Sequence, residues 1–186
     1  MGCENLMDSL SREYRDQFPV AENLIWLHHA GVSPLCLSAS KAMRELTLDV
    51  EQWASFHFFD WMKVYDSIRV EAGNLIGASS EEIAIVKNTS EGISMIQRGI
   101  DWKPGDKVVA FEEEFPANYF PWKVLEQEGV QIQWLSIYDP LEAIDQACEG
   151  ARLLSVSMVN YLSGYRMDLQ AIGEICRRRN VFFIVD

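Results

Sequence analysis

The sequence has 186 residues, a length that can bury a substantial core in one or two domains. Hydrophobic residues make up 48% and charged residues 24%, as in ordinary soluble globular proteins, and a formal net charge of −12 argues against a nucleic-acid-binding or anionic-membrane surface. No apolar run approaches the length of a membrane span. The four cysteines are isolated and the histidines lack metal-ligand spacing, so we expect no metal site and, without a signal segment, a cytoplasmic protein with reduced thiols.

The first 76 residues are predicted to be mainly helical. Apolar residues recur at helical spacing in most of this part, and one short apolar run followed by a loop is a strand candidate. In chain order, we expect a helix over residues 9–17, a strand over 24–27, a loop over 28–34 and helices over 37–51 and 59–76. We treat residues 1–76 as an amino-terminal helical segment with a loop.

Beyond residue 76, strands and helices alternate regularly. The strands are expected over residues 83–86, 107–111, 130–135, 152–157 and 181–185, and the helices over 90–98, 118–128, 140–149 and 168–180. Asp168 is a plausible N-cap for the last helix. This alternation is typical of an α/β fold, in which a mostly parallel sheet carries helices on both faces, and it defines a second region over residues 77–186.

Thr89 and Ser90 open a predicted helix directly after the first strand of this second region. Backbone N–H groups at a helix amino end are unpaired and the helix dipole favours an anion, so hydroxyl residues there can bind phosphate. The alternative is that Thr89 or Ser90 is a routine N-cap. The chain contains neither G-x-G-x-x-G nor G-x-x-x-x-G-K-[ST], which argues against dinucleotide and P-loop sites.

Asp186 follows the apolar strand over residues 181–185, where open α/β sheets bind their ligands. A carboxylate there can pair with a protonated ring nitrogen, although a turn residue or helix cap is the competing interpretation. An anion site and a carboxylate on one sheet fit a ligand that carries a phosphate and a basic nitrogen. Pyridoxal 5′-phosphate (PLP) is such a ligand.

Two further residues follow predicted strands. Phe115 can stack on a flat cofactor ring, or it can simply pack beneath its loop. Asn160 can donate a hydrogen bond to a phenolate oxygen, or it can be an ordinary loop asparagine.

Taken together, these segments resemble the class V aminotransferases, a group of fold-type-I PLP enzymes that includes cysteine desulfurases, isopenicillin-epimerase-like proteins and kynureninases. The matching segments, in chain order, are WLHHAGVSP from residue 26, NTSEGI from residue 88, EFPAN from residue 114, SMVN from residue 157 with Gly164 after it, and FFIVD from residue 182. The resemblance covers nearly all residues from about 22 to 186 and implies that residues 77–186 are the first part of a PLP-binding large domain.

The resemblance also implies roles for individual residues. By the family pattern, Thr89 and Ser90 bind the phosphate, Phe115 stacks on the ring, Asn160 contacts the ring oxygen and Asp186 contacts the ring nitrogen. Many members carry a histidine where this chain has Phe115. The pattern also brings His29, Ala30 and Gly31 near a small amino-acid substrate, and it implies a homodimer.

The lysine that links PLP to the enzyme in this family is expected beyond residue 186. The six lysines of the chain do not occupy its motif: Lys41, Lys63, Lys87, Lys103, Lys107 and Lys123. We therefore expect the amino-terminal, apparently truncated half of an aminotransferase-like enzyme, with no catalytic lysine and little or no turnover by itself. Two alternatives remain open: a cysteine desulfurase or lyase on the same scaffold, and a non-catalytic cofactor-binding or assembly module.

Overall fold

The computed structural model describes residues 11–29 and 31–186, which divide into two compact units on either side of the boundary between Ala84 and Ile85. The first unit is helical. Its elements are a helical stretch over residues 11–14, the 3₁₀ turn η1 (Arg15–Gln17), α2 (Val20–Asn23), α3 (Leu37–Trp53), α4 (Phe58–Ile76) and the 3₁₀ turn η2 (Ser80–Glu82). The two long helices confirm the predicted ones, and α4 ends at Gly77, whose φ of 73° suits glycine.

The predicted strands over residues 24–27 and 83–86 are wrong. Both segments lack strand structure, and no strand in the described part of the chain pairs with either of them. An apolar run becomes a β-strand only when a neighbour satisfies its backbone hydrogen bonds. Within the described residues, no helix is both long and apolar enough to cross a membrane.

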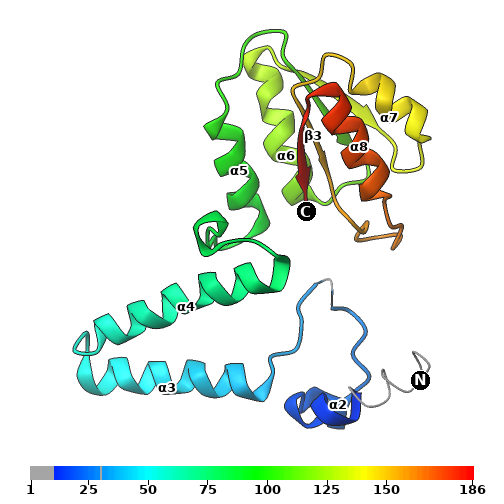
Figure 1. The fold of residues 1–186 in the computed structure, drawn as a ribbon. Coiled ribbons are helices and arrows are strands. Elements are labelled where there is room, and N and C mark those ends of the chain that lie inside the picture. Colours follow the sequence, from blue (N-terminus) through cyan, green and yellow to red (C-terminus); the bar gives the residue numbers. More distant parts are fainter. Residues whose placement is uncertain (1–10, 30) are drawn as a thin grey trace. The chain divides into compact units, whose positions relative to one another are not determined.

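The second unit is an α/β layer structure (Figure 1). Its helical elements are α5 (Thr89–Gly99), α6 (Pro116–Lys123), the 3₁₀ helix η3 (Val124–Glu128), α7 (Leu141–Ala147) and α8 (Leu169–Arg179). Its strands are β1 (Lys107–Phe111), β2 (Gln131–Leu135), β3 (Leu153–Val156) and β4 (Phe182–Val185). The strands form one sheet in the order β2-β1-β3-β4, and every pairing is parallel.

Two hydrophobic cores lie against this sheet, one on each face. Successive side chains of a strand point to opposite faces, so Val109 and Phe111 of β1 join the core under α7 and α8. Val108 and Ala110 join the other core, which packs against α5, α6 and η3. The sequence prediction of a parallel α/β sheet with helices on both faces is confirmed.

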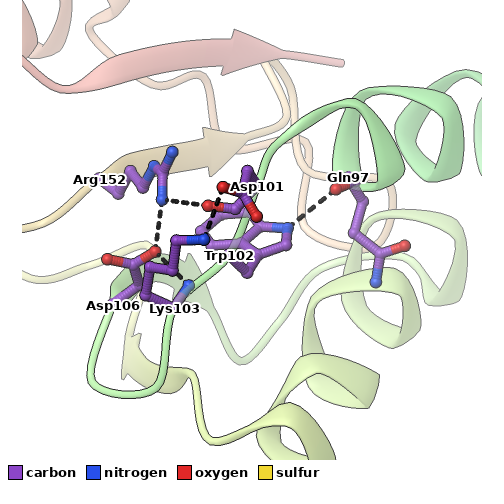
Figure 2. Close-up of polar contacts among 6 residues, drawn as sticks. All are labelled: Gln97, Asp101, Trp102, Lys103, Asp106 and Arg152. Carbon is purple, nitrogen blue, oxygen red and sulfur yellow. Dashed lines mark hydrogen bonds and ion pairs between the residues drawn. The ribbon is translucent and has the colours of Figure 1, made fainter.

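The amino ends of β1 and β3 are tied together by Arg152 (Figure 2). Its guanidinium donates to the carbonyl of Asp101 over 2.7 Å and to the carboxylate of Asp106 over 2.5 Å. It also lies 5.5 Å from the centre of the Trp102 ring, whose Nε1 donates to the carbonyl of Gln97. These contacts fix the turn between α5 and β1 to the start of β3, and so hold α5 alongside the sheet.

Helices α7 and α8 are linked by Asp145, and this ion pair predicts a pH-dependent stability. Arg179 and Arg178 of α8 donate to its carboxylate over 2.8 to 3.0 Å and hold the pKa of Asp145 far below its ordinary value. A carboxyl group whose pKa falls on folding stabilises the folded state above its unfolded pKa of about 3.9, and this contribution is lost as the pH falls further. We expect Asp145→Asn to lower the melting temperature at pH 7, with the difference from the parent shrinking below about pH 4.

Thermal unfolding followed by circular dichroism between pH 3 and pH 8 measures this effect. Glu142→Gln is the matched control, because it removes a negative charge from the same helix, and Glu142 forms no ion pair with any residue that the structure describes. A melting-temperature difference for Asp145→Asn that stays constant down to pH 3 would contradict the prediction.

Candidate functional site

The candidate site lies at the edge of the sheet where the strands end. Because the four strands are parallel, the segments that follow β1, β3 and β4 leave the sheet at one edge. Helix α5 runs back along the sheet into β1, so its amino end reaches this same edge (Figure 1). The structure therefore brings the segments that carry Thr89, Ser90, Phe115, Asn160 and Asp186 to one edge of the second unit.

Asn88, and neither Thr89 nor Ser90, is the N-cap of α5. Its Oδ1 accepts a hydrogen bond from the N–H of Glu91 over 2.9 Å, and the Glu91 carboxylate accepts from the N–H of Lys87 over 2.8 Å. This second bond is the main reason why the pKa of Glu91 lies below its ordinary value. Thr89 and Ser90 occupy the first turn and are exposed, and their hydroxyls make no hydrogen bond within the part of the chain that the structure describes.

Phe115 is the N-cap residue of α6 and is 49% exposed. One edge of the ring meets Tyr161, with ring centres 5.1 Å apart and the planes at 78°. Much of the ring is therefore open, whereas a residue packed beneath its loop would be covered. This arrangement leaves apolar ring surface on which a flat ligand can stack.

Asn160 is buried, with 4% of its surface exposed, and its hydrogen bonds organise the loop after β3. Its Oδ1 accepts from the backbone N–H groups of Leu162 and Ser163, over 3.1 and 2.9 Å, and from the Ser163 hydroxyl over 2.9 Å. Its Nδ2 donates to the carbonyl of Glu113 over 2.8 Å. The side chain therefore has the structural role of a loop asparagine, and the second proton on Nδ2 has no partner among the described residues.

Asp186 continues the ladder between β3 and β4. Its N–H donates to the carbonyl of Val156 over 3.0 Å, and its carbonyl accepts from Met158 over 2.9 Å. The residue is exposed, and its carboxylate makes no hydrogen bond or ion pair with any residue that the structure describes. A charged acceptor thus stands at the end of the strand without a protein partner.

The predicted substrate residues belong to the first unit, and Ala30 lies outside the described residues. The carbonyl of His29 accepts from the Ser33 hydroxyl over 2.9 Å. A Cβ on Gly31 would lie 2.1 Å from Nε2 of His28, so this position accommodates glycine as long as the His28 ring stays in place. Their role toward a substrate stays a prediction.

Two glutamates at this edge were not predicted from the sequence as site residues. The Glu113 carboxylate accepts from the Ser136 hydroxyl over 2.6 Å and from the N–H of Ile137 over 3.1 Å. Burial raises the pKa of Glu113, but the hydrogen bonds to its carboxylate, these two foremost, outweigh burial and the net shift is downward. Glu114 is 7% exposed and accepts from the N–H and the hydroxyl of Ser157, over 2.6 and 2.5 Å. The feature of the sequence that could have indicated these two site residues is the run of three glutamates directly after a buried strand.

Comparison with known protein families identifies the family of this chain. The model of the family described as aminotransferase class-V matches residues 25–186. The chain belongs to the aminotransferase class-V family. The resemblance found in the sequence is therefore confirmed.

No cluster of three or more histidine, cysteine, aspartate or glutamate side chains within the described residues can hold a metal ion.

The similar proteins of this family include cysteine desulfurases. The chain is 26% identical over 185 residues to a probable cysteine desulfurase of Methanothermobacter thermautotrophicus, covering 95% of this chain and 46% of that protein. It is 28% identical over 177 residues to the cysteine desulfurase IscS of Shewanella frigidimarina, covering 87% and 44%. The apo structure of a cysteine desulfurase from Thermococcus onnurineus NA1 has a TM-score of 0.83 at 25% identity, over 94% of this chain and 46% of that one. The chain spans about half the length of the curated relatives it matches.

Proposed function

We propose that this chain forms the amino-terminal part of the cofactor-binding domain of a PLP-dependent enzyme that acts on an amino acid. The observation that carries the proposal is the convergence at one sheet edge of free hydroxyls, a half-exposed aromatic ring and an unpaired carboxylate. These groups fit PLP, which needs an anion site, a stacking surface and a partner for its ring nitrogen. Membership of the aminotransferase class-V family supports the same cofactor.

Each residue then has a defined task. Thr89 and Ser90, with the unpaired N–H groups at the start of α5, bind the phosphate. Phe115 holds one face of the ring, the second Nδ2 proton of Asn160 reaches the ring oxygen, and Asp186 keeps a proton on the ring nitrogen. When bound, PLP supplies an electron sink for bonds broken at the α-carbon of the substrate.

The relatives favour removal of sulfur from cysteine as the reaction of the complete enzyme. One relative named above is described as a probable cysteine desulfurase, and the other and the solved structure as cysteine desulfurases, so this reaction has at least as much support as transamination. We further propose that the complete enzyme is a cytoplasmic homodimer. The alternative of a non-catalytic cofactor-binding or assembly module makes the same prediction for PLP binding, and differs in expecting no turnover from any complete form.

None of the six lysines is proposed to link covalently to PLP. Of the four in the second unit, Lys103 and Lys107 lie at the amino edge, and Lys123 ends α6. Lys87 precedes α5, and its Nζ lies 3.5 Å from the Glu91 carboxylate. We therefore assign this chain to binding and orienting the cofactor.

The test is a PLP titration of the isolated chain, followed by absorbance and by equilibrium dialysis. We expect saturable binding of one PLP per chain, and about tenfold weaker binding by Asp186→Asn, which loses a hydrogen bond between charged groups. Asp101→Asn is the matched control, because Asp101 is an exposed aspartate near the opposite edge of the sheet. Absence of saturable binding by the parent chain would sink the cofactor proposal.

Two further assays on the PLP-loaded chain address the reaction. Borohydride reduction followed by peptide mass spectrometry should find no stoichiometric PLP adduct on any of the six lysines. Assays for sulfide and alanine from cysteine, and for oxo acids from other amino acids, should find little or no turnover. A stoichiometric adduct on Lys87, or robust transamination by the isolated chain, would contradict the assignment.

A further inference from the structure

The loops after β1 and β3 are joined by reciprocal hydrogen bonds. From the first loop, the buried carboxylate of Glu114 accepts both the N–H and the hydroxyl of Ser157. From the second loop, the buried amide of Asn160 donates to the carbonyl of Glu113. Two adjacent residues on one loop therefore hold two residues that lie three positions apart on the other.

These contacts set the relative position of two proposed cofactor residues. Phe115 directly follows Glu114, and its ring meets Tyr161, which directly follows Asn160. Displacement of either loop would therefore change how the Phe115 ring lies relative to the Asn160 amide. Catalytic and binding groups need such support, because small errors in their placement cost much of their effect.

We propose that Glu114 is a positioning residue whose carboxylate, acting through Ser157, fixes Phe115 and Asn160 relative to each other so that both engage one flat pyridine ring. The inference rests on the proposed function for the identity of that ring. Glu114 itself does not touch the ring. It acts because a carboxylate can accept two hydrogen bonds at once, and Ser157 supplies one from its backbone and one from its side chain.

The competing explanation is that Glu114 only joins β1 to β3. The fold contains a matched contact for that role, since Asp106 joins the same two strands at their amino ends through Arg152 (Figure 2). A variant at Asp106 loses a carboxylate that links β1 to β3 but leaves the loops at the carboxyl edge intact. Asp106→Ala is therefore the control for Glu114→Ala.

The first measurement is hydrogen exchange of the free chain, read at the amide protons of Leu162 and Ser163, which donate to Asn160. If Glu114 positions Asn160, Glu114→Ala speeds exchange at these two amides about tenfold or more, and Asp106→Ala leaves it within about twofold. Glu114→Gln restores slow exchange, because its amide oxygen still accepts the Ser157 N–H while the hydroxyl can accept from its NH₂ group. Should Glu114→Ala fail to fold, Ser157→Ala replaces it and must raise exchange at the same amides.

The second measurement is PLP titration of the same variants. Glu114→Ala is expected to raise the Kd for PLP about tenfold, Glu114→Gln by no more than about threefold, and Asp106→Ala by no more than about twofold. The inference is overturned if exchange at Leu162 and Ser163 is unchanged in Glu114→Ala and Ser157→Ala, or if Asp106→Ala weakens PLP binding as much as Glu114→Ala. If the parent chain binds no PLP, the proposed function fails, and the exchange data still decide whether Glu114 positions Asn160.

Discussion

Replacing Thr89 and Ser90 together by alanine is expected to weaken PLP binding about a hundredfold. Both hydroxyls stand exposed in the first turn of α5 without a protein partner, so in the proposed complex they are free to donate to the phosphate. A hydrogen bond to a charged group contributes about 1.5 to 3 kcal/mol, and exposure to water favours the lower value for each of the two. The variant keeps the Asn88 cap, so α5 itself should remain folded.

The choice of ligand sharpens this test. Pyridoxal has the same ring without the phosphate, so its binding should differ by no more than about twofold between the parent and the double variant. Ser94→Ala, which removes a hydroxyl one turn further along α5, should leave PLP binding unchanged. If the double variant binds PLP as tightly as the parent does, the phosphate lies elsewhere and the assignment of the α5 amino end is wrong.

The fold prediction succeeded for elements that the local sequence pattern determines, and it failed where a strand also needs a partner strand. Helices α3 and α4 and the four observed strands follow from apolar periodicity and turn residues, and Asp168 caps α8 as expected, accepting from the N–H of Ala171. The apolar run over residues 83–86 has the same local pattern as these strands. It lacks a paired neighbouring strand within the described residues, and no local pattern reports this.

The candidate site was predictable to the extent that topology determines it. Parallel strands end at one edge, so the predicted parallel sheet already placed the polar residues after its strands at a common edge, whereas the strand order that makes β3 and β4 neighbours came from the structure. The contact of Glu114 with Ser157 spans 43 positions in the sequence and depends on β1 and β3 being neighbours. Whether Asn88, Thr89 or Ser90 caps α5 depends on one turn of backbone, which residue preferences alone do not resolve.

Trp122→Ala is expected to have the largest effect on stability. The ring is fully buried between α6 and the sheet, and its Nε1 donates to Oδ1 of Asn118 over 3.1 Å. Truncating a buried tryptophan removes its apolar contacts and leaves a cavity, at a cost of about 3 to 5 kcal/mol. The free energy of unfolding of small domains is only about 5 to 15 kcal/mol. We therefore expect a markedly lower urea midpoint and, under mild heating, unfolding of the second unit.

Trp53→Ala is the matched control, because the same side chain is removed from α3, where Trp53 is 56% exposed. We expect its free energy of unfolding to fall by less than about 1 kcal/mol. Equal losses of unfolding free energy for the two variants would mean that burial of Trp122 does not stabilise the core beneath α6.

The result also bears on the site, because α6 begins next to Phe115, and the Asn118 oxygen that accepts from Trp122 also accepts from Ser155 of β3 over 2.7 Å. Loss of Trp122 should therefore loosen the loop that presents the stacking ring, so Trp122→Phe, which keeps most of the apolar volume, should retain more PLP binding than Trp122→Ala.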